Sequence, residues 1–404
     1  MNIRVRGRGR RWPFIVGGLV VVIGICIAVW GLWSNREPYT PAEQAIVTTP
    51  RPIQITSDIL FLGNTFWGRY THEYAMKSSL GYEYPFSRLH QLDRDKYNAW
   101  ISGLECPLKG DIHMTAAEQE KNLQFNCSPD FTAEAKKWFT AFSLANNHTD
   151  NQGTDGFVET QQHLEEQDIQ YVGHYDPDRL EDICEVIALP VTVKYSDDSV
   201  KEELLPVALC AYHGVFKIPS QVAVDEIARY SEMMPVFAMP HMGAEYKPVP
   251  DQIKTDFYHR LIDAGADVVL GDHPHWIQTT EAYKGKLIVY SMGNFMFDQN
   301  WNPELMRSAA IHTRLTIKEG ALEEWLSFGA ECRIYQDDCL EHAKQQNLTR
   351  LQPGYEFSAV GTQTDRQALT GRADTSTEQL ILDRLKWDDT MHGLSLPYAP
   401  LSVR

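Results

Sequence analysis

The stretch at residues 261–298 constrains the fold most strongly, because two short apolar runs within it each end at a polar turn. Residues 267–270 are followed by Gly271, Asp272 and a His-Pro-His segment at 273–275, and residues 287–290 are followed by Ser-Met-Gly-Asn. Buried strands of α/β proteins are short apolar runs of this kind. Ligands bind beyond the carboxyl ends of such strands. The sequence therefore predicts an α/β sheet with polar side chains gathered at one edge.

The same pattern recurs at four earlier runs, residues 58–62, 98–101, 141–145 and 235–239. Each run ends in a loop that carries a potential metal ligand. With the stretch above, the candidates are Asn64, Glu105, Asn147, His148, His241, His273 and His275. A single strand-terminal Asn or His is more often a turn former or a solvated loop residue. Their succession at five strand ends favours a metal centre.

The side-chain types in this set indicate which metals they suit. Imidazole nitrogens combined with carboxylate and amide oxygens suit zinc, manganese or iron better than calcium. Two cations about 3.5–4 Å apart clamp the attacking and leaving oxygens of a phosphoester, and the carboxylate of Glu105 could bridge them. The pattern therefore predicts one or two divalent metal ions and a hydrolase-type site.

The amino terminus predicts a membrane anchor. Residues 1–11 contain five arginines and no acid, and residues 12–33 contain no charged residue. About 20 apolar residues span a bilayer as a helix, and arginines before the span hold the tail in the cytoplasm. A cleaved signal peptide is the alternative, although its apolar core is usually about 7–15 residues. We expect a cytoplasmic tail at 1–11, a transmembrane helix at 12–33, a linker at 34–52 and an extracellular domain beyond it.

The charge and cysteine content bear on what lies beyond the predicted span. The chain has net charge −17, and its first 36 residues contribute +6, which leaves −23 for the remainder. An acidic domain argues against nucleic acid as a partner. Six of the seven cysteines follow the predicted span and would face an oxidising compartment. Six cysteines allow fifteen pairings, and six buried thiols are the alternative.

Positions along the chain favour three particular disulfides. Cys184 and Cys210 are nearly symmetric about a polar turn at 197–198, so an antiparallel hairpin would place them opposite each other. The other two predicted pairs bracket a polar excursion and a short turn, and they are Cys106 with Cys127 and Cys332 with Cys339.

An ordered set of motifs resembles the bacterial capsule synthesis protein CapA family. The motifs are Ala-Asn-Asn-His at 145–148, Gly-Ala-Glu-Tyr at 243–246, Gly-Ala-Asp at 265–267, Gly-x-His-Pro-His at 271–275 and Tyr-Ser-Met-Gly-Asn-Phe at 290–295. The likeness covers about residues 55–298. It implies a calcineurin-like metallophosphatase fold, an αββα sandwich, and a role in poly-γ-glutamate capsule formation.

The resemblance also implies roles for individual residues. The metal ligands carried over are Glu105, Asn147, His241, His273 and His275, with Asn64 at the remaining ligand position. His148 would act as an acid or as a transition-state-stabilising imidazole beside the metals. Three further site residues lie in or beside the same motifs, namely Asn146, Glu245 and Asn294.

This chain departs from the family pattern at several positions. The family usually has aspartate where this chain has Asn64 and Asn151, histidine where it has Asp272, asparagine where it has Gly103 and tryptophan where it has Met242. An amide oxygen offers less to a dication than a carboxylate does. We therefore expect one firm cation site and a weaker second one.

Two functions of different classes follow from these features. The first is a membrane-anchored, outward-facing CapA-like hydrolase of capsule or envelope polymer biogenesis, which acts on a phosphoester or on the polyanionic γ-glutamyl polymer. The second is a non-catalytic scaffold subunit with a degenerate metal site, bound beside membrane subunits of a polymer synthase or export complex.

The expected domain organisation ends in a less regular segment. We expect a metallophosphatase-like domain at 53–342 and a partly irregular extension at 343–404. Runs at 310–317 and 325–334 would close the sheet, and residues 351–376 are polar and rich in turn formers.

Overall fold

The computed structural model describes residues 49–334 and 336–402. The predicted tail at 1–11, the predicted transmembrane helix at 12–33 and most of the linker at 34–52 lie outside the described residues. Among the helices that are described, none has both the length and the apolar character needed to cross a bilayer. Residues 50–404 form one compact unit, which contains all of the predicted site residues.

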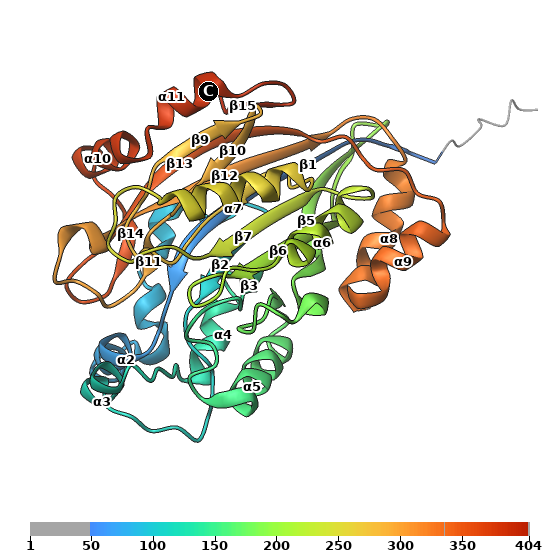
Figure 1. Ribbon diagram of the computed structural model, residues 1–404. Helices are drawn as coiled ribbons and strands as arrows, with labels where there is room; N and C mark the ends of the chain where they lie inside the picture. Colours follow the sequence, from blue (N-terminus) through green and yellow to red (C-terminus); the bar gives the residue numbers. More distant parts are fainter. Residues whose placement is uncertain (1–48, 335, 403–404) are drawn as a thin grey trace, which may run out of the picture. The chain divides into compact units, whose positions relative to one another are not determined.

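The unit is built on a mixed sheet in which strand β1 (Pro52–Thr65) is shared by four neighbours (Figure 1). It pairs in parallel with β2 (Ala99–Leu104) and β11 (Asn294–Met296), and antiparallel with β5 (Cys184–Tyr195) and β12 (Arg307–Ile317). The main path through the sheet is β14-β13-β12-β1-β5-β6-β7-β8-β10-β9. The other strands are β3 (Ala141–Ser143), β4 (Gln170–Val172), β6 (Val200–His213), β7 (Val236–His241), β8 (Val268–Leu270), β9 (Thr280–Tyr283), β10 (Lys286–Val289), β13 (Gly354–Thr364), β14 (Thr370–Arg372) and β15 (Tyr398–Pro400).

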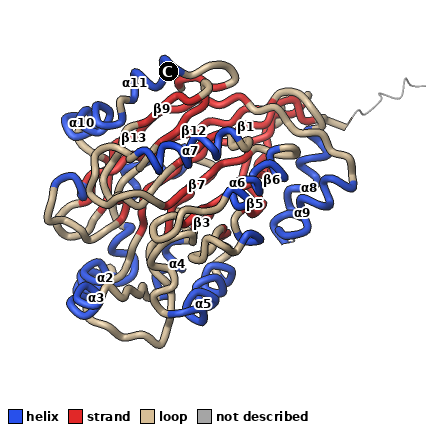
Figure 2. Tube along the Cα trace, viewed as in Figure 1, coloured by secondary structure: helices blue, strands red, loops and turns tan. Residues whose placement is uncertain are grey.

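Helices flank the strands of this unit (Figure 2). They are α2 (Arg69–Lys77), α3 (Ala116–Asn122), α4 (Thr132–Ala135), α5 (Gly153–Glu166), α6 (Gln221–Ser231), α7 (Gln252–Asp263), α8 (Leu322–Ile334), α9 (Gln336–Gln345), α10 (Thr375–Leu385) and α11 (Trp387–Gly393). Short 3-10 helices lie at Gly81–Phe86, Leu89–Leu92, Arg94–Lys96, Pro129–Phe131, Leu180–Asp182 and Pro303–Met306.

Several helices begin at a side chain that satisfies a free main-chain N–H group, as short polar residues do at this position. Ser220 caps α6, Asp251 caps α7 and Asp374 caps α10, each by accepting from the N–H group three residues later. At α3, Thr115 and Glu118 form a reciprocal capping box. Local sequence therefore fixes where these helices start.

Two hydrophobic cores lie on opposite faces of β1, because successive side chains of a strand point to opposite faces. Ile59 and Phe61 belong to a large core that includes β5 to β8, whereas Leu60 and Leu62 belong to an aromatic core that includes Trp67 and residues of β2 and β3. β1 therefore contributes apolar side chains to the cores on both faces of the sheet.

The α/β prediction is confirmed, and two local predictions are wrong. Residues 325–334 form helix α8 and not a strand, because Trp325, Phe328 and Cys332 recur at the helical period and are buried on one face. Residues 351–376 contain β13 and β14, although their composition predicts turns. β13 pairs with β12 along its length, so tertiary pairing overrides a weak local pattern.

All three predicted disulfides are present in the structure. Cys184 and Cys210 are directly opposite in the β5–β6 pair, with their Cα atoms 4.0 Å apart. The other two bonds join Cys106 with Cys127 and Cys332 with Cys339.

Candidate metal centre

The predicted site residues come from two sets of parallel strands whose carboxyl ends meet. β1, β2 and β3 are parallel to one another, and β6, β7 and β8 form a second parallel set. Side chains in the loops that follow the first set of strands contact side chains in the loops that follow the second set. These contacts form two neighbouring groups.

The first group, here called the His241 cluster, joins the loop after β3 to the ends of β7 and β8. His241 Nε2 lies 2.8 Å from Asn147 Oδ1 and 3.2 Å from His273 Nδ1. Its other nitrogen, Nδ1, lies 3.4 Å from Asn146 Nδ2. His241 and His273 are buried. Three predicted ligands are therefore in contact here.

The second group, here called the His275 cluster, joins the ends of β1 and β2 to the loop after β8. His275 Nδ1 lies 2.8 Å from Asn294 Oδ1 and 3.4 Å from Asn64 Nδ2, and its Nε2 lies 3.5 Å from Glu105 Oε1. The ring centroids of His273 and His275 are 6.1 Å apart, so the two clusters are neighbours.

The backbone at the site adopts conformations that the structure around it must enforce. His273 and His275 have φ angles of 90° and 60°, a region that non-glycine residues rarely occupy and that is enriched at functional sites. The end of β1 is tightly fitted as well, because Asn64 N–H donates to Gly293 O and a Cβ atom at Gly63 would lie 1.9 Å from that oxygen. Glycine at position 63 allows this close approach.

Burial makes the imidazoles of both clusters poor bases. It lowers the pKa of His241 and His273 well below the usual value, and neighbouring histidines lower it further. Burial also lowers the pKa of His275 to about 4. Conversely, burial raises the pKa of Glu105 well above its usual value, and the nearby carboxylate of Asp272 adds to that effect. Neutral imidazoles with lone pairs and crowded buried acids together favour a cation.

Several buried oxygens of the site have no hydrogen-bond partner among the described residues. They are Asn64 Oδ1, Glu105 Oε2 and both carboxylate oxygens of Asp272. A buried oxygen without a partner is destabilising, and a divalent cation beside His275 would satisfy those of Asn64 and Glu105. In the described part of the chain, however, no three His, Cys, Asp or Glu side chains converge closely enough to form a metal site by themselves. The donor set fits a cation only with the amide oxygens of Asn64 and Asn147 included.

His148 lies beside the His241 cluster and outside its hydrogen bonds. Its main-chain N–H donates to Asn146 Oδ1, and its Nδ1 lies 3.0 Å from Asn151 Oδ1. Because an amide oxygen only accepts, Nδ1 carries the hydrogen and Nε2 has a free lone pair. Burial lowers the pKa of His148 to about 4, and its ring packs on Phe125 at 4.3 Å. His148 is thus held neutral, with the lone pair of Nε2 available as a hydrogen-bond acceptor.

Glu245 does not join either cluster. It is exposed in the loop after β7 and takes part in none of the hydrogen bonds that hold the two clusters together. Its neighbour Tyr246 stacks on His275 with ring centroids 5.8 Å apart, a contact that the sequence pattern does not predict.

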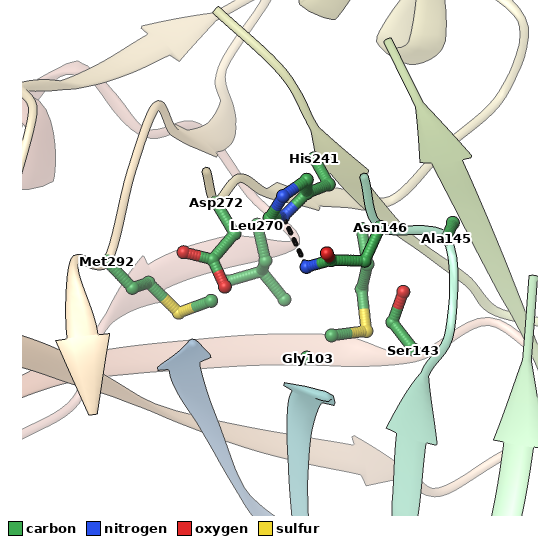
Figure 3. A pocket seen from close by; sticks show the side chains of 9 residues that line it. Gly103, Ser143, Ala145, Asn146, His241, Leu270, Asp272 and Met292 are labelled. Carbon is green, nitrogen blue, oxygen red and sulfur yellow. Dashed lines mark hydrogen bonds between the residues drawn. The ribbon is translucent and has the colours of Figure 1, made fainter. Parts of the chain in front are cut away.

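The structure also places two residues at the site that the sequence argument does not include. Asp272 lines a small cavity together with His241 and Asn146 (Figure 3), although the sequence pattern marks it only as a departure from a motif. His213 ends β6 and is aligned with His241 on β7. Its Nδ1 lies 2.5 Å from Tyr175 O, and its Nε2 is buried without a partner among the described residues. Its position directly after an apolar run is the signal that could have found it.

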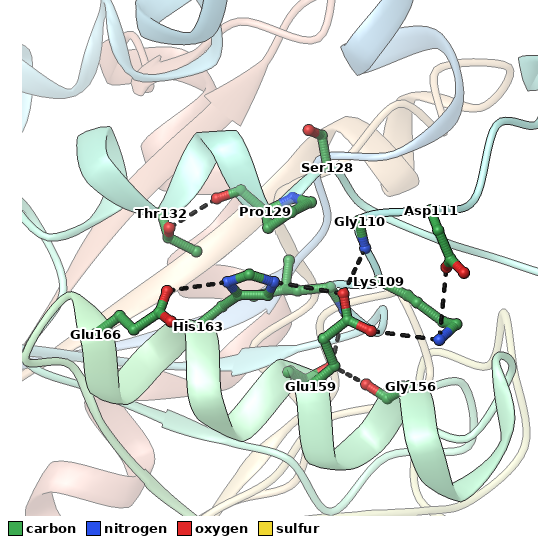
Figure 4. Close-up of polar contacts among 12 residues, drawn as sticks. Lys109, Gly110, Asp111, Ser128, Pro129, Thr132, Gly156, Glu159, His163 and Glu166 are labelled. Atoms are coloured by element: carbon green, nitrogen blue, oxygen red, sulfur yellow. Dashed lines mark hydrogen bonds and ion pairs between the residues drawn. The ribbon is translucent and has the colours of Figure 1, made fainter.

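The polar excursion after Glu105, the segment at 106–127, is held in place by a disulfide and by α5. Besides the Cys106–Cys127 bond, Glu159 of α5 accepts from the main-chain N–H of Gly110 at 2.8 Å and from Lys109 Nζ at 3.3 Å (Figure 4). A cavity of about 620 Å³ borders this excursion. It is lined by charges of both signs, which come from Arg69, Glu73, Lys109 and Asp130, and by two histidines, His72 and His113.

The comparison with protein families decides the identity of the chain. The model of the bacterial capsule synthesis protein family PGA_cap matches residues 58–299, which is more than half of the chain and includes both clusters. The chain belongs to this family.

Two curated relatives support this family membership. The capsule biosynthesis protein CapA of Bacillus anthracis is 27% identical over 74% of this chain and 71% of its own length. The PGA biosynthesis protein CapA of Bacillus subtilis (strain 168) is 28% identical over 63% of this chain and 67% of its own length. A solved structure, TT1561 of Thermus thermophilus, aligns with 63% of this chain and 93% of its own length at 11% identity with a TM-score of 0.32, which is too low to carry an argument.

Proposed function

We propose that this capsule synthesis protein is a metal-dependent hydrolase that faces outward from the cell membrane and acts in the biogenesis of a capsule or envelope polymer. The observation that carries the proposal is the convergence of unpartnered buried oxygens with neutral imidazoles at the strand ends, where Asn64 and Glu105 face His275. Family membership supports the biological setting.

The same proposal includes the finer features of fold and location. We infer a metallophosphatase-like αββα arrangement, which is supported by the two cores on opposite faces of β1. We also infer that residues 12–33 anchor the chain and leave the domain extracellular, which is supported by the uncharged span after an arginine-rich tail. The three disulfides fit an oxidising compartment.

Two positions for divalent cations follow from the two clusters. The ligands of one would be Asn147, His241 and His273, and those of the other would be Asn64, Glu105 and His275. Manganese, zinc and iron suit this mixture of nitrogen and oxygen donors. A divalent cation bound there would act as a Lewis acid on an oxygen of the bond to be broken.

The residues of the chain itself would orient the substrate and move the proton. His148 Nε2 is free to accept a proton from the attacking group, because Asn151 holds the ring through Nδ1. Its position beside the His241 cluster would place that transfer next to the metals. This role is that of a base, whereas the sequence pattern suggested an acid or a stabilising imidazole.

Two classes of substrate are compatible with such a centre, a phosphoester and the γ-glutamyl polymer. The chain beyond residue 36 has net charge −23, so a polyanion gains no general electrostatic attraction from it. Binding of a polyanion would therefore depend on the cations themselves.

A second candidate is a non-catalytic scaffold subunit beside membrane subunits of a polymer synthase. Asn64 favours it, because this position offers a neutral amide oxygen to a cation. The absence of a metal site made of His, Cys, Asp and Glu alone within the described residues points the same way. The two candidates differ in whether bound metal supports hydrolysis.

The test begins with the metal content of the purified full-length protein. After chelation and reloading with manganese or zinc, elemental analysis should find bound metal, and a chromogenic phosphodiester should be hydrolysed. His275→Ala should lower both metal content and activity, because it removes a ligand. His148→Ala should lower activity by about 10²–10⁴-fold with little change in metal content, because its role is proton transfer.

The possible outcomes separate the two candidates. Absence of bound metal in the reloaded parent protein would overturn the hydrolase proposal. Bound metal without hydrolysis of phosphodiesters or of a γ-glutamyl oligomer would favour the scaffold.

A further inference from the structure

Asp272 is a buried carboxylate that the two proposed cation positions leave without a role. The residue is 7% exposed, and neither of its side-chain oxygens has a hydrogen-bond partner among the described residues. An isolated carboxylate in a protein interior is strongly destabilising unless a positive charge is near. Something must compensate this group when it is ionised.

The main chain of Asp272 is held in place by its neighbours. Asp272 N–H donates to Pro240 O at 3.0 Å, Met242 N–H donates to Asp272 O at 3.4 Å, and the residue forms a β-bridge with His241. The main chain is therefore held on both sides, and the carboxylate projects into the small cavity shared with Asn146 and His241 (Figure 3).

The carboxylate of Asp272 and the amide of Asn64 both lie close to Gly103. A Cβ atom at Gly103 would be 3.3 Å from Asp272 Oδ2 and 3.9 Å from Asn64 Oδ1. Both oxygens are buried and have no partner among the described residues. One belongs to an acid and the other to an amide, and they come from the loop after β8 and from the end of β1. Because Gly103 has no side chain, the space between them stays open.

Lys254, whose charge acts on Asp272, does not hydrogen-bond its carboxylate. The buried ammonium group of Lys254 donates to Gln278 Oε1 at 3.1 Å and not to the carboxylate. Main-chain N–H groups of His273 and Asn64 lie near it but are not in hydrogen-bond geometry. A neighbouring acid, Glu105, also has an unpartnered oxygen.

We propose that Asp272 supplies the negative charge for the cation at the His275 cluster, where Asn64 supplies a neutral oxygen. This inference rests on the proposed binding of a divalent cation at the strand ends. It assigns the anionic ligand to the loop after β8 instead of the end of β1. The second cation site then keeps two carboxylates, those of Glu105 and Asp272, and does not depend on a charge at position 64.

The experiment measures manganese binding and thermal unfolding in the full-length protein. Asp272→Asn should weaken manganese binding by about 10- to 100-fold, as measured by electron paramagnetic resonance titration. The melting temperature of the chelated protein should rise or stay the same, because the change removes a buried carboxyl group that no described residue hydrogen-bonds. The exchange variant Asn64→Asp with Asp272→Asn keeps the number of carboxylates and should restore manganese affinity close to that of the parent.

A matched control is Asp267→Asn, which also removes a buried carboxylate. Asp267 is paired with Arg350 at 2.7 Å and lies directly before β8, at the opposite end of that strand from both clusters. This variant should lower the melting temperature and leave manganese affinity unchanged.

The results distinguish the role of Asp272 from the proposed function. If the parent binds manganese and Asp272→Asn binds it equally well, the role of Asp272 is overturned while the proposed function stands. A lower melting temperature of chelated Asp272→Asn would also overturn it, because the carboxylate would then be compensated by the protein. If the parent binds no manganese, both proposals fail.

Discussion

Asn151 shows how one substituted residue can keep a contact and change its chemistry. Its Oδ1 atom accepts from His148 Nδ1 at 3.0 Å and from the main-chain N–H of Phe125 at 2.9 Å. A carboxylate, which the family pattern usually places here, would accept the same two hydrogen bonds. It would also add a negative charge that stabilises the protonated ring. The amide therefore orients His148 and leaves it neutral.

We predict that Asn151→Asp raises the pKa of His148 above its value of about 4, because the added carboxylate favours the charged imidazole. If neutral His148 accepts the proton, activity falls as the pH drops through its pKa, and in the variant this fall occurs at a higher pH. The titration of the His148 ring protons by nuclear magnetic resonance measures the shift in the chelated protein. An unchanged pKa would contradict the prediction.

Sequence reasoning found residues of both clusters because strand ends converge in α/β sheets. It could place a residue at a strand end, but it could not give the direction of its side chain. Asp272 therefore counted as a lost histidine, whereas the structure shows a carboxylate aimed at the cavity beside Asn146. His213 was not among the candidates, although it ends β6 directly after an apolar run, as His241 ends β7.

At the scale of elements, the β5–β6 hairpin depends on its cross-strand disulfide. These strands pair antiparallel from Cys184 with Cys210 to Lys194 with Val200, and the disulfide closes the open end of the hairpin. That end leads directly into the site, through His213 at the end of β6.

We predict that replacing both Cys184 and Cys210 by alanine lowers the free energy of unfolding by about 3 kcal/mol, because the unfolded chain regains the freedom of the closed loop. Metal content should stay unchanged, since the backbone pairing of β6 with β7 remains. Urea unfolding followed by circular dichroism measures the first quantity and elemental analysis the second. A stability equal to that of the parent would show that the hairpin does not need the bond.

Helix α8 shows why element type was harder to predict than element position. Its apolar residues are dense enough to fit either a strand or a helix, and periodicity alone separates such runs poorly. In the structure Gly329 lies so close to Leu204 O that a Cβ atom would be 1.9 Å from it. This contact packs α8 against β6. Because β6 is distant in the sequence, a local pattern does not contain this information.

At the scale of the whole unit, the segment after residue 343 belongs to the main sheet. β13 pairs with β12 from Arg307 with Gln363 to Thr316 with Gly354, and β15 also pairs with β13. The ring of Tyr355 lies 6.1 Å from that of Phe237 on β7. The pairing joins segments that are separated by helices α8 and α9, so no local signal in the sequence predicted it.

We predict that a chain ending at residue 342 does not form a stable domain, because β12 loses one of its two partner strands and the large core loses Tyr355 and Phe357. Limited proteolysis should degrade this truncated chain rapidly, whereas a chain ending at residue 402 should yield a resistant fragment. Equal resistance of the two chains would mean that the extension is dispensable.

The three disulfides have a consequence for how the protein is made. Each bond joins cysteines that are consecutive along the chain after residue 34: Cys106 with Cys127, Cys184 with Cys210, and Cys332 with Cys339. A chain that is threaded through a membrane presents its thiols in that order. An enzyme that oxidises each new pair as it emerges therefore produces the native set directly. If this chain crosses a membrane as proposed, it would need an oxidase at that step and no isomerase to exchange wrongly paired cysteines.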